Sequence, residues 1–232
     1  MAIIPLSERY GILGHLYPKK ATTHSIGHGG APAESGRQAM KLLHIDSSAL
    51  GDQSVTRELS AAIVSRWQET LPGLQVERLD LDANPIPHMT ARTLNRTDAI
   101  CNEKEDAMLQ QFLDADAVVI GAPMYNFAIP STLKAWIDRI TVRGKTFRYT
   151  EKGAEGLAGG KRVIVATGRG SAHGDNAPSD FQEPYLRYLF GFIGIKDVEF
   201  VRAEGVGLSP EHRAEALAKA HASIAAPLPK AA

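Results

Sequence analysis

The 232 residues are enough for one large domain or two small ones, and a hydrophobic content of 44% suffices for a substantial core. The 26 basic and 26 acidic side chains balance, so no overall field favours nucleic acid or an anionic membrane as a partner. Cys101 is the only cysteine, which excludes a disulfide framework and favours a reducing cytoplasm, where we expect the protein to reside.

The first 39 residues differ in composition from the rest of the chain. They are rich in Gly, Ala and Ser and show no sustained apolar period, which predicts disorder. A small excess of basic residues leaves a weak transit peptide open as an alternative. Met40 directly precedes the first apolar run, so we interpret residues 1–39 as a disordered or misassigned extension and 40–232 as a single domain. Sequencing the native N-terminus tests this, and an intact Met1 would contradict it.

From Met40 onward, short apolar runs alternate with amphipathic stretches. The run 41–45 predicts a strand covered on both faces, and 55–68 predicts a helix with one apolar stripe. Residues 74–81 alternate between apolar and polar, as a more exposed strand does. A helix near 102–113 and a buried strand at 117–125 follow.

The second half continues the same alternation. A helix is expected from Pro130, with Ser131 available as a cap, and 162–168 predicts a fourth strand. An apolar helix at 184–195, a strand at 197–203 and a helix at 209–224 complete the series. Regular alternation of strands and helices predicts an α/β fold, with a doubly wound five-stranded parallel sheet and helices on both faces.

In such sheets a ligand lies beyond the carboxyl ends of the strands, here the loops at 46–56, 122–128 and 167–173. The sequence lacks the glycine-rich dinucleotide fingerprint, the P-loop, paired zinc ligands and the nucleophile elbow. The first loop is rich in hydroxyls and leads into a helix, whose unpaired N–H groups favour an anion such as phosphate. From the residues alone, two interpretations of Ser54 stay open, a phosphate ligand or an ordinary helix cap.

The second loop is more specific. Its sequence, APMYNFAIPSTLKAWID (122–138), resembles the signature of the FMN-dependent NADH-azoreductases and NADH:quinone oxidoreductases of the bacterial azoreductase family. Further stretches match in order, namely GKTFRYTEKGAEGL (144–157), TGRGSAH (167–173), YLFGFIGI (188–195) and VRAEG (201–205). The resemblance covers essentially 40–232.

This resemblance implies a flavodoxin-like fold, a homodimer and one non-covalent FMN per subunit. By motif position, the implied cofactor-binding residues are Ser48, Ser54, Val55 and Thr56 for the phosphate, Met124, Tyr125, Asn126 and Phe127 for the ribityl chain and ring, and Gly168, Arg169, Gly170 and Ser171 for the pyrimidine end. This sequence departs from the family pattern at two places. Val55 stands where the family often has a polar residue. The third loop has Gly at position 168 and Ser at position 171, where the Ser-Arg-Gly-Gly-like pattern of the family has Ser first and Gly last.

Other interpretations of these side chains stay open. Tyr125 and Phe127 could be core aromatics, and Gly170 could serve a tight turn. His173 could be a surface residue or contact the substrate, and His44 is expected in the core. The aromatic stretch 188–192 could form part of the site wall and reach a partner subunit.

The implied activity is an NAD(P)H-dependent, two-electron reduction of quinones and a reductive cleavage of azo compounds. We expect a ping-pong mechanism in which hydride passes through flavin N5 and no side chain acts as general acid. NADH and NADPH are both open as donors. Two alternatives are a flavodoxin-type electron carrier, which the neutral charge disfavours, and a module that has lost its flavin and binds partners.

Overall fold

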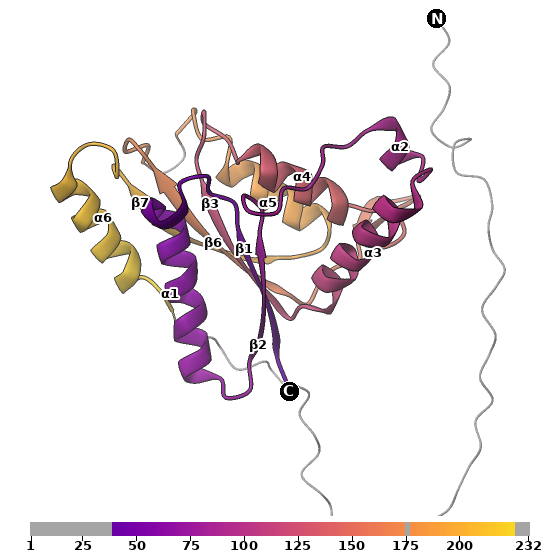
Figure 1. Ribbon diagram of the computed structural model, residues 1–232, viewed down its shortest axis with the longest axis horizontal. Coiled ribbons are helices and arrows are strands. Elements are labelled where there is room, and N and C mark those ends of the chain that lie inside the picture. Colours follow the sequence, from indigo (N-terminus) through magenta and orange to yellow (C-terminus); the bar gives the residue numbers. More distant parts are fainter. Residues whose placement is uncertain (1–38, 175–176, 226–232) are drawn as a thin grey trace, which may run out of the picture. The chain divides into compact units, whose positions relative to one another are not determined.

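The computed structural model describes residues 39–174 and 177–225 (Figure 1). The predicted disorder of the N-terminal extension falls on residues 1–38, which lie outside these ranges. The described residues belong to one compact unit. Within the described ranges, no helix combines the length and the apolar character that crossing a membrane requires.

Five parallel strands form the sheet, in the order β2-β1-β3-β6-β7. The predicted α/β doubly wound sheet is therefore confirmed, and every predicted strand is present. β2 lies at an edge and is largely exposed, as its alternating pattern predicts, whereas β3 is buried throughout. The strands span Lys41–Asp46 (β1), Gln75–Asp80 (β2), Ala117–Pro123 (β3), Arg162–Arg169 (β6) and Asp197–Glu204 (β7).

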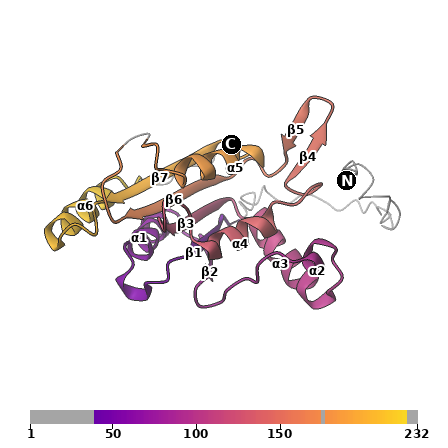
Figure 2. The same cartoon turned by 90° about the horizontal axis from the view of Figure 1, so that it is seen from above.

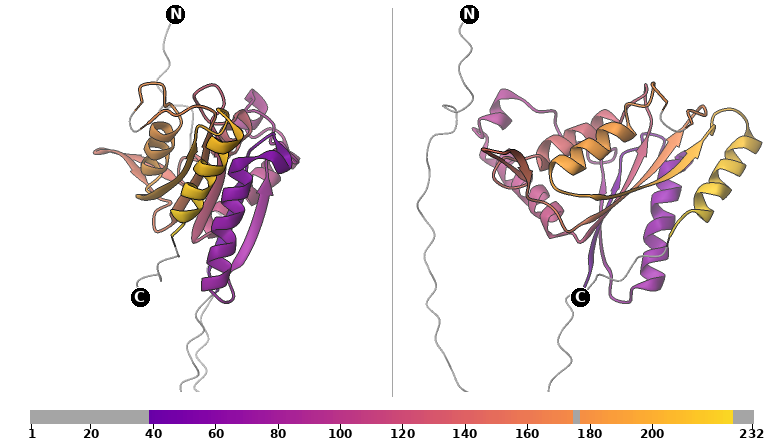
Figure 3. Two further views of the ribbon diagram at one scale, coloured as in Figure 1. Left: turned by 90° about the vertical axis from the view of Figure 1, so that its left-hand side faces the viewer. Right: turned by 180° about the vertical axis from the view of Figure 1, so that it is seen from behind.

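Helices cover both faces of this sheet because successive strand side chains point to opposite sides. Val163 and Val165 of β6 belong to one buried cluster, and Ile164 and Ala166 belong to the other. Helices α1 and α6 pack on one face, where Figure 3 shows them side by side, and α3, α4 and α5 pack on the other (Figures 1 and 2). These helices span Val55–Thr70 (α1), Ala99–Asp114 (α3), Ser131–Ile140 (α4), Glu183–Phe192 (α5) and Pro210–Ala222 (α6).

The helix ends follow the predicted capping chemistry with one exception. The side chains of Ser54 and Ser209 accept hydrogen bonds from the first turns of α1 and α6. Pro130 precedes α4 instead of opening it, and Ser131 is the first helical residue. The expectation that Ser131 caps this helix is wrong, because no side-chain hydrogen bond is made there.

Four short elements were not predicted from the sequence. Gly51–Gln53 (η2) form a 3₁₀ turn before α1, and Ala91–Leu94 (α2) form one helical turn. Phe147–Thr150 (β4) and Gly153–Gly156 (β5) form an antiparallel hairpin, which projects away from the main sheet in Figure 2. Its strands are too short to show an apolar period, so only the length of the 144–160 segment indicated a separate element.

Candidate functional site

The three predicted loops meet at the carboxyl edge of the sheet. The hydroxyl of Tyr125 accepts a hydrogen bond from the Ala49 amide at 3.2 Å and lies 3.3 Å from the Ser48 hydroxyl. The Met124 amide donates to the carbonyl of Gly168 at 2.9 Å. A Cβ at Gly168 would lie only 3.1 Å from Cγ2 of Thr56, so the third loop also touches the first. The structure thus brings together three loops that lie far apart in the sequence, with Thr56 and Gly168 separated by 112 positions.

The first loop ends at the N-terminus of α1, where Ser54 is the capping residue. Its hydroxyl accepts a hydrogen bond from the Arg57 amide at 3.3 Å and lies 3.1 Å from the hydroxyl of Thr56. The amides of Val55 and Thr56 lie in the first turn of α1, where no carbonyl of the same helix is available to accept their hydrogen bonds. Two hydroxyls, two such amides and the positive end of the helix dipole form a donor set that suits a phosphate. The cap is confirmed, and it is compatible with anion binding at the same place.

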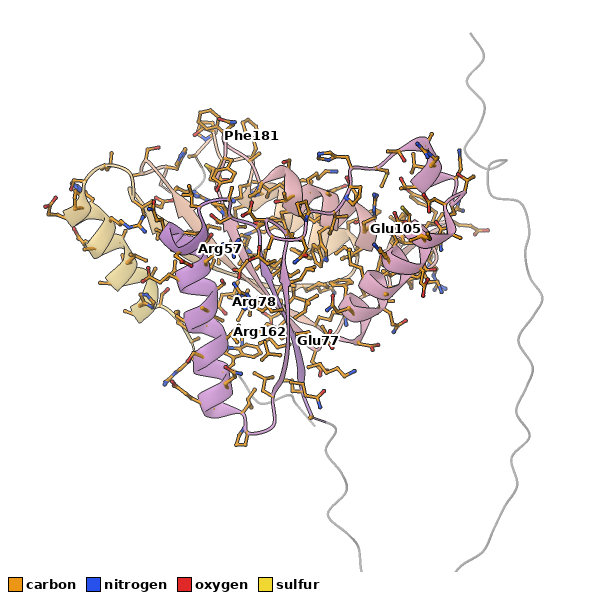
Figure 4. The ribbon with its side chains drawn as sticks, viewed as in Figure 1. Arg57, Glu77, Arg78, Glu105, Arg162 and Phe181 are labelled. Atoms are coloured by element: carbon orange, nitrogen blue, oxygen red, sulfur yellow. The ribbon has the colours of Figure 1, made fainter. Side chains whose placement is uncertain are left out.

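Arg57, in the first turn of α1, holds this loop in place (Figure 4). Its Nη2 donates to the carbonyl of Ser48 at 2.9 Å, and its Nη1 and Nη2 donate to the carboxylate of Asp80 at the end of β2. This pairing with Arg57 holds the pKa of the Asp80 carboxyl well below its usual range. Sequence reasoning missed Arg57 because its partner lies 23 residues away on another strand.

A buried carboxylate, Asp46, lies directly below the loop at the end of β1. It accepts hydrogen bonds from Ser60 at 2.9 Å and from Arg78 at 2.7 Å, and Nε2 of His44 lies 3.4 Å away. Burial alone would raise the pKa of Asp46, but the contacts with His44, Arg78 and Ser60 outweigh it and lower the pKa. His44 is buried, as predicted, although it serves a polar cluster and bonds to Ser60.

The second loop turns back on itself after β3. Tyr125 and Ala128 exchange backbone hydrogen bonds, and the two residues between them adopt positive φ angles, 49° at Asn126 and 71° at Phe127. Such angles are unfavourable for residues other than glycine and concentrate at functional sites. The turn leaves the Phe127 ring 53% exposed, which excludes a core role and makes the ring available to an aromatic ligand.

The third loop carries Gly170, Ser171 and His173. Gly170 and Ser171 are exposed, and the Ser171 hydroxyl lies 3.3 Å from Nε2 of His173. The rings of His173 and Phe127 are nearly perpendicular, with their centroids 6.3 Å apart, so His173 adjoins the site. The side chain of Arg169 is 2% exposed and pairs with carboxylates, so any contact of this residue with a ligand would come from its backbone.

The aromatic stretch 188–192 lies apart from these loops. Tyr188 is 77% exposed, and the ring of Phe192 packs against Phe147 of the hairpin at 4.7 Å. Because α5 leads from the carboxyl end of β6 back to the start of β7, its last residues lie toward the opposite edge of the sheet. Within one chain, Phe192 therefore does not join the wall of the site.

Comparison with known proteins extends these observations. Residues 40–228 match the model of a family described by its flavodoxin-like fold. An FMN-dependent NADH:quinone oxidoreductase of Stenotrophomonas maltophilia is 60% identical over 185 residues, covering 80% of this chain and 94% of its own. A protein of the same name from Methylocella silvestris is 51% identical over 199 residues, covering 80% and 97%.

Solved structures agree with these relatives. An azoreductase from Bacillus anthracis superimposes with a TM-score of 0.73 at 30% identity, covering 80% of this chain and 96% of that one. An FMN-dependent NADH-azoreductase of the same species, solved in complex with FMN, gives a TM-score of 0.72 at 27% identity, covering 80% and 95%.

Proposed function

The chain belongs to the family with the flavodoxin-like fold that matches residues 40–228, and from this premise we propose that it is an FMN-dependent oxidoreductase. It takes electrons from NADH and reduces quinones and azo compounds by two electrons, in keeping with the names of its relatives and structural neighbours. The observation that carries the proposal is the convergence of three loops on the N-terminus of α1.

The residues present suit FMN in three parts. The hydroxyls of Ser54 and Thr56, with the amides of Val55 and Thr56, hold the phosphate, and Ser48 extends this donor set. Met124 to Phe127 would hold the ribityl chain and the ring, to which Phe127 offers an exposed aromatic side chain. The backbone from Gly168 to Ser171 would bind the pyrimidine end of the ring. When bound, FMN supplies the hydride chemistry.

The chain itself contributes binding, orientation and electrostatics. Arg57 fixes the carbonyl of Ser48 and so sets the position of the phosphate loop. Amide groups of Gly170 and Ser171 provide donors for negative charge at the pyrimidine edge. NADH and the acceptor would bind in turn at the same site, which would give a ping-pong order. No side chain is assigned as general acid, and NADPH remains a second donor to be tested.

A homodimer and a cytoplasmic location complete the proposal. Large apolar side chains stay exposed on the hairpin and α5, among them Tyr149 and Tyr188 at 60% and 77%. Contact with a second subunit would cover them, and it would allow the aromatic stretch 188–192 to approach the partner's site. Light scattering of the purified protein tests the dimer, and a monomeric mass would contradict it.

The activity is tested by an absorbance spectrum and by donor oxidation. We expect a flavin spectrum with one FMN per chain, and NADH oxidation that depends on an added quinone or azo dye. A flavin spectrum without NADH oxidation would indicate an electron carrier. A colourless protein that takes up no added FMN would indicate a module without flavin. Parallel assays with NADPH establish the donor preference.

A further inference from the structure

Arg169 is a buried cation at the last residue of β6, within the third loop of the candidate site. Its side chain is 2% exposed. Nη2 donates to Asp180 at 2.7 Å and lies 3.7 Å from Glu183, and Nη1 donates to Glu204 at 3.0 Å. One guanidinium thus joins the segment before α5, the start of α5 and the end of β7. A planar group with five donors can bridge such partners, whereas an ammonium group cannot reach all of them at once.

Two of these carboxylates also hold the backbone of the segment between β6 and α5, which is described at 170–174 and 177–182. Oδ1 of Asp180 accepts hydrogen bonds from the amides of Gln182 and Glu183 at 2.9 and 3.0 Å. Oε2 of Glu204 accepts one from the amide of Gly174 at 3.2 Å. Arg169 therefore anchors the segment on both sides. Glu204 connects it to residues 170–174, and Asp180 connects it to residues 177–182.

The anchored arms support the exposed groups of the candidate site. The residue after Asp180, Phe181, donates its amide to the carbonyl of Phe127 at 3.1 Å, and it lies at the upper edge of the sheet in Figure 4. The residue before it, Ser179, has its hydroxyl 3.1 Å from Nδ1 of His173. Displacement of Asp180 would consequently disturb both the hydrogen bond to the Phe127 carbonyl and the contact that orients the His173 ring.

We propose that Arg169 is a positioning residue, which braces residues 170–174 and 177–182 and thereby fixes Phe127 and His173 around the flavin ring without contacting the flavin through its side chain. This inference rests on the proposed function for its ligand, FMN. The motif position alone would indicate that Arg169 is a direct cofactor ligand. The inference instead gives its side chain an indirect, positioning role.

The same strand offers a matched control. Arg162, the first residue of β6, donates to Glu199 of β7 at 2.6 Å, and it lies low on the sheet in Figure 4. It shares with Arg169 the strand, the partner strand and the type of pair, but it lies at the opposite edge. Any general loss of stability from weakening a β6–β7 ion pair should appear in both variants, whereas an effect on the site should appear only at Arg169.

The experiment compares Arg169→Lys and Arg162→Lys with the native protein. Amide hydrogen exchange of the apoprotein is measured over peptides from 170–182, and the dissociation constant for FMN is measured by quenching of flavin fluorescence. Urea unfolding records overall stability. We expect Arg169→Lys to exchange faster at 177–182 and to bind FMN about tenfold more weakly, equivalent to about 1.4 kcal/mol. Arg162→Lys should change neither.

A second variant protects the test against misfolding of Arg169→Lys. Asp180→Asn keeps an oxygen for the amides of Gln182 and Glu183 but removes the charge that pairs with Arg169, so it should shift both readouts in the same direction. Native exchange at 177–182 in both variants, or FMN binding within about twofold of native, would overturn the inference. Failure of the native protein to bind FMN would instead overturn the proposed function. The hydrogen-exchange comparison of the apoproteins would still show whether Arg169 holds residues 177–182 in place.

Discussion

A methyl group added at Gly156 should detach the β4–β5 hairpin from the end of α5. The backbone of β5 passes so close to the turn after α5 that a Cβ on Gly156 would lie 2.1 Å from the amide nitrogen of Gly194 and 2.3 Å from the carbonyl carbon of Ile193. Both atoms belong to backbone, so a side-chain rotation cannot relieve the overlap. Only movement of the hairpin or of the turn can.

The expected cost follows from these distances. Non-bonded carbon contacts are favourable near 3.5 Å or beyond, so the two backbones must separate by roughly 1 Å or more. Such a shift breaks the hydrogen bond from the Ala158 amide to the Ile193 carbonyl, now 2.8 Å. Overpacking costs about 1–3 kcal/mol and the lost hydrogen bond about 1 kcal/mol more. We therefore expect Gly156→Ala to lower the free energy of unfolding by about 2–4 kcal/mol.

Urea unfolding measures this change, with Gly191→Ala as the control. Gly191 lies in α5 near the same contact, but a Cβ there would meet nothing within 4 Å. Alanine at Gly191 should stabilise the helix by up to about 1 kcal/mol. If the two variants unfolded within about 0.5 kcal/mol of each other, the hairpin would not be docked through this backbone contact, and the reasoning would be refuted.

Three further outcomes are expected. Asp46 and Asp80 have folded-state pKa values below their ordinary ones, so their contribution to the free energy of unfolding is present at neutral pH. This contribution is lost as the pH falls below about 4. A urea unfolding midpoint that stayed constant through that pH range would contradict this. Arg57→Lys cannot serve both Ser48 and Asp80, so its FMN affinity, measured by fluorescence titration, should fall several-fold, and native affinity would argue against the proposed role of Arg57. Phe192→Ala should slow quinone reduction without lowering the FMN content of the protein. Unchanged kinetics would contradict the proposal that residues 188–192 approach the site of the partner subunit.

The sequence allowed the sheet and the three loops of the candidate site to be predicted because both depend on local patterns. Apolar runs such as 117–123 identify buried strands, and the alternation of elements fixes a parallel sheet with its ligand edge. The hydroxyls of Ser54 and Thr56 were found because a helix N-terminus has a recognisable local sequence.

The parts that escaped prediction depend on contacts between distant residues. Arg57 meets Asp80 across 23 positions and Arg169 meets Glu204 across 35, and nothing near either arginine indicates its partner. Motif position placed Arg169 among the cofactor ligands, whereas its buried side chain is paired with the carboxylates of Asp180 and Glu204. The docking of the hairpin depends on one glycine contact, Gly156 with Gly194, which a sequence pattern does not reveal.

The central claim is that the N-terminus of α1 holds the phosphate of FMN, and Ser54→Asp tests it most directly. Aspartate caps a helix as well as serine does, so α1 should remain intact, but its charge would repel a phosphate. Ser209→Asp makes the same change at the cap of α6. Flavin absorbance per chain is the measurement. We expect a folded, colourless Ser54→Asp protein and a yellow Ser209→Asp protein, and one FMN per chain in Ser54→Asp would contradict phosphate binding at the N-terminus of α1.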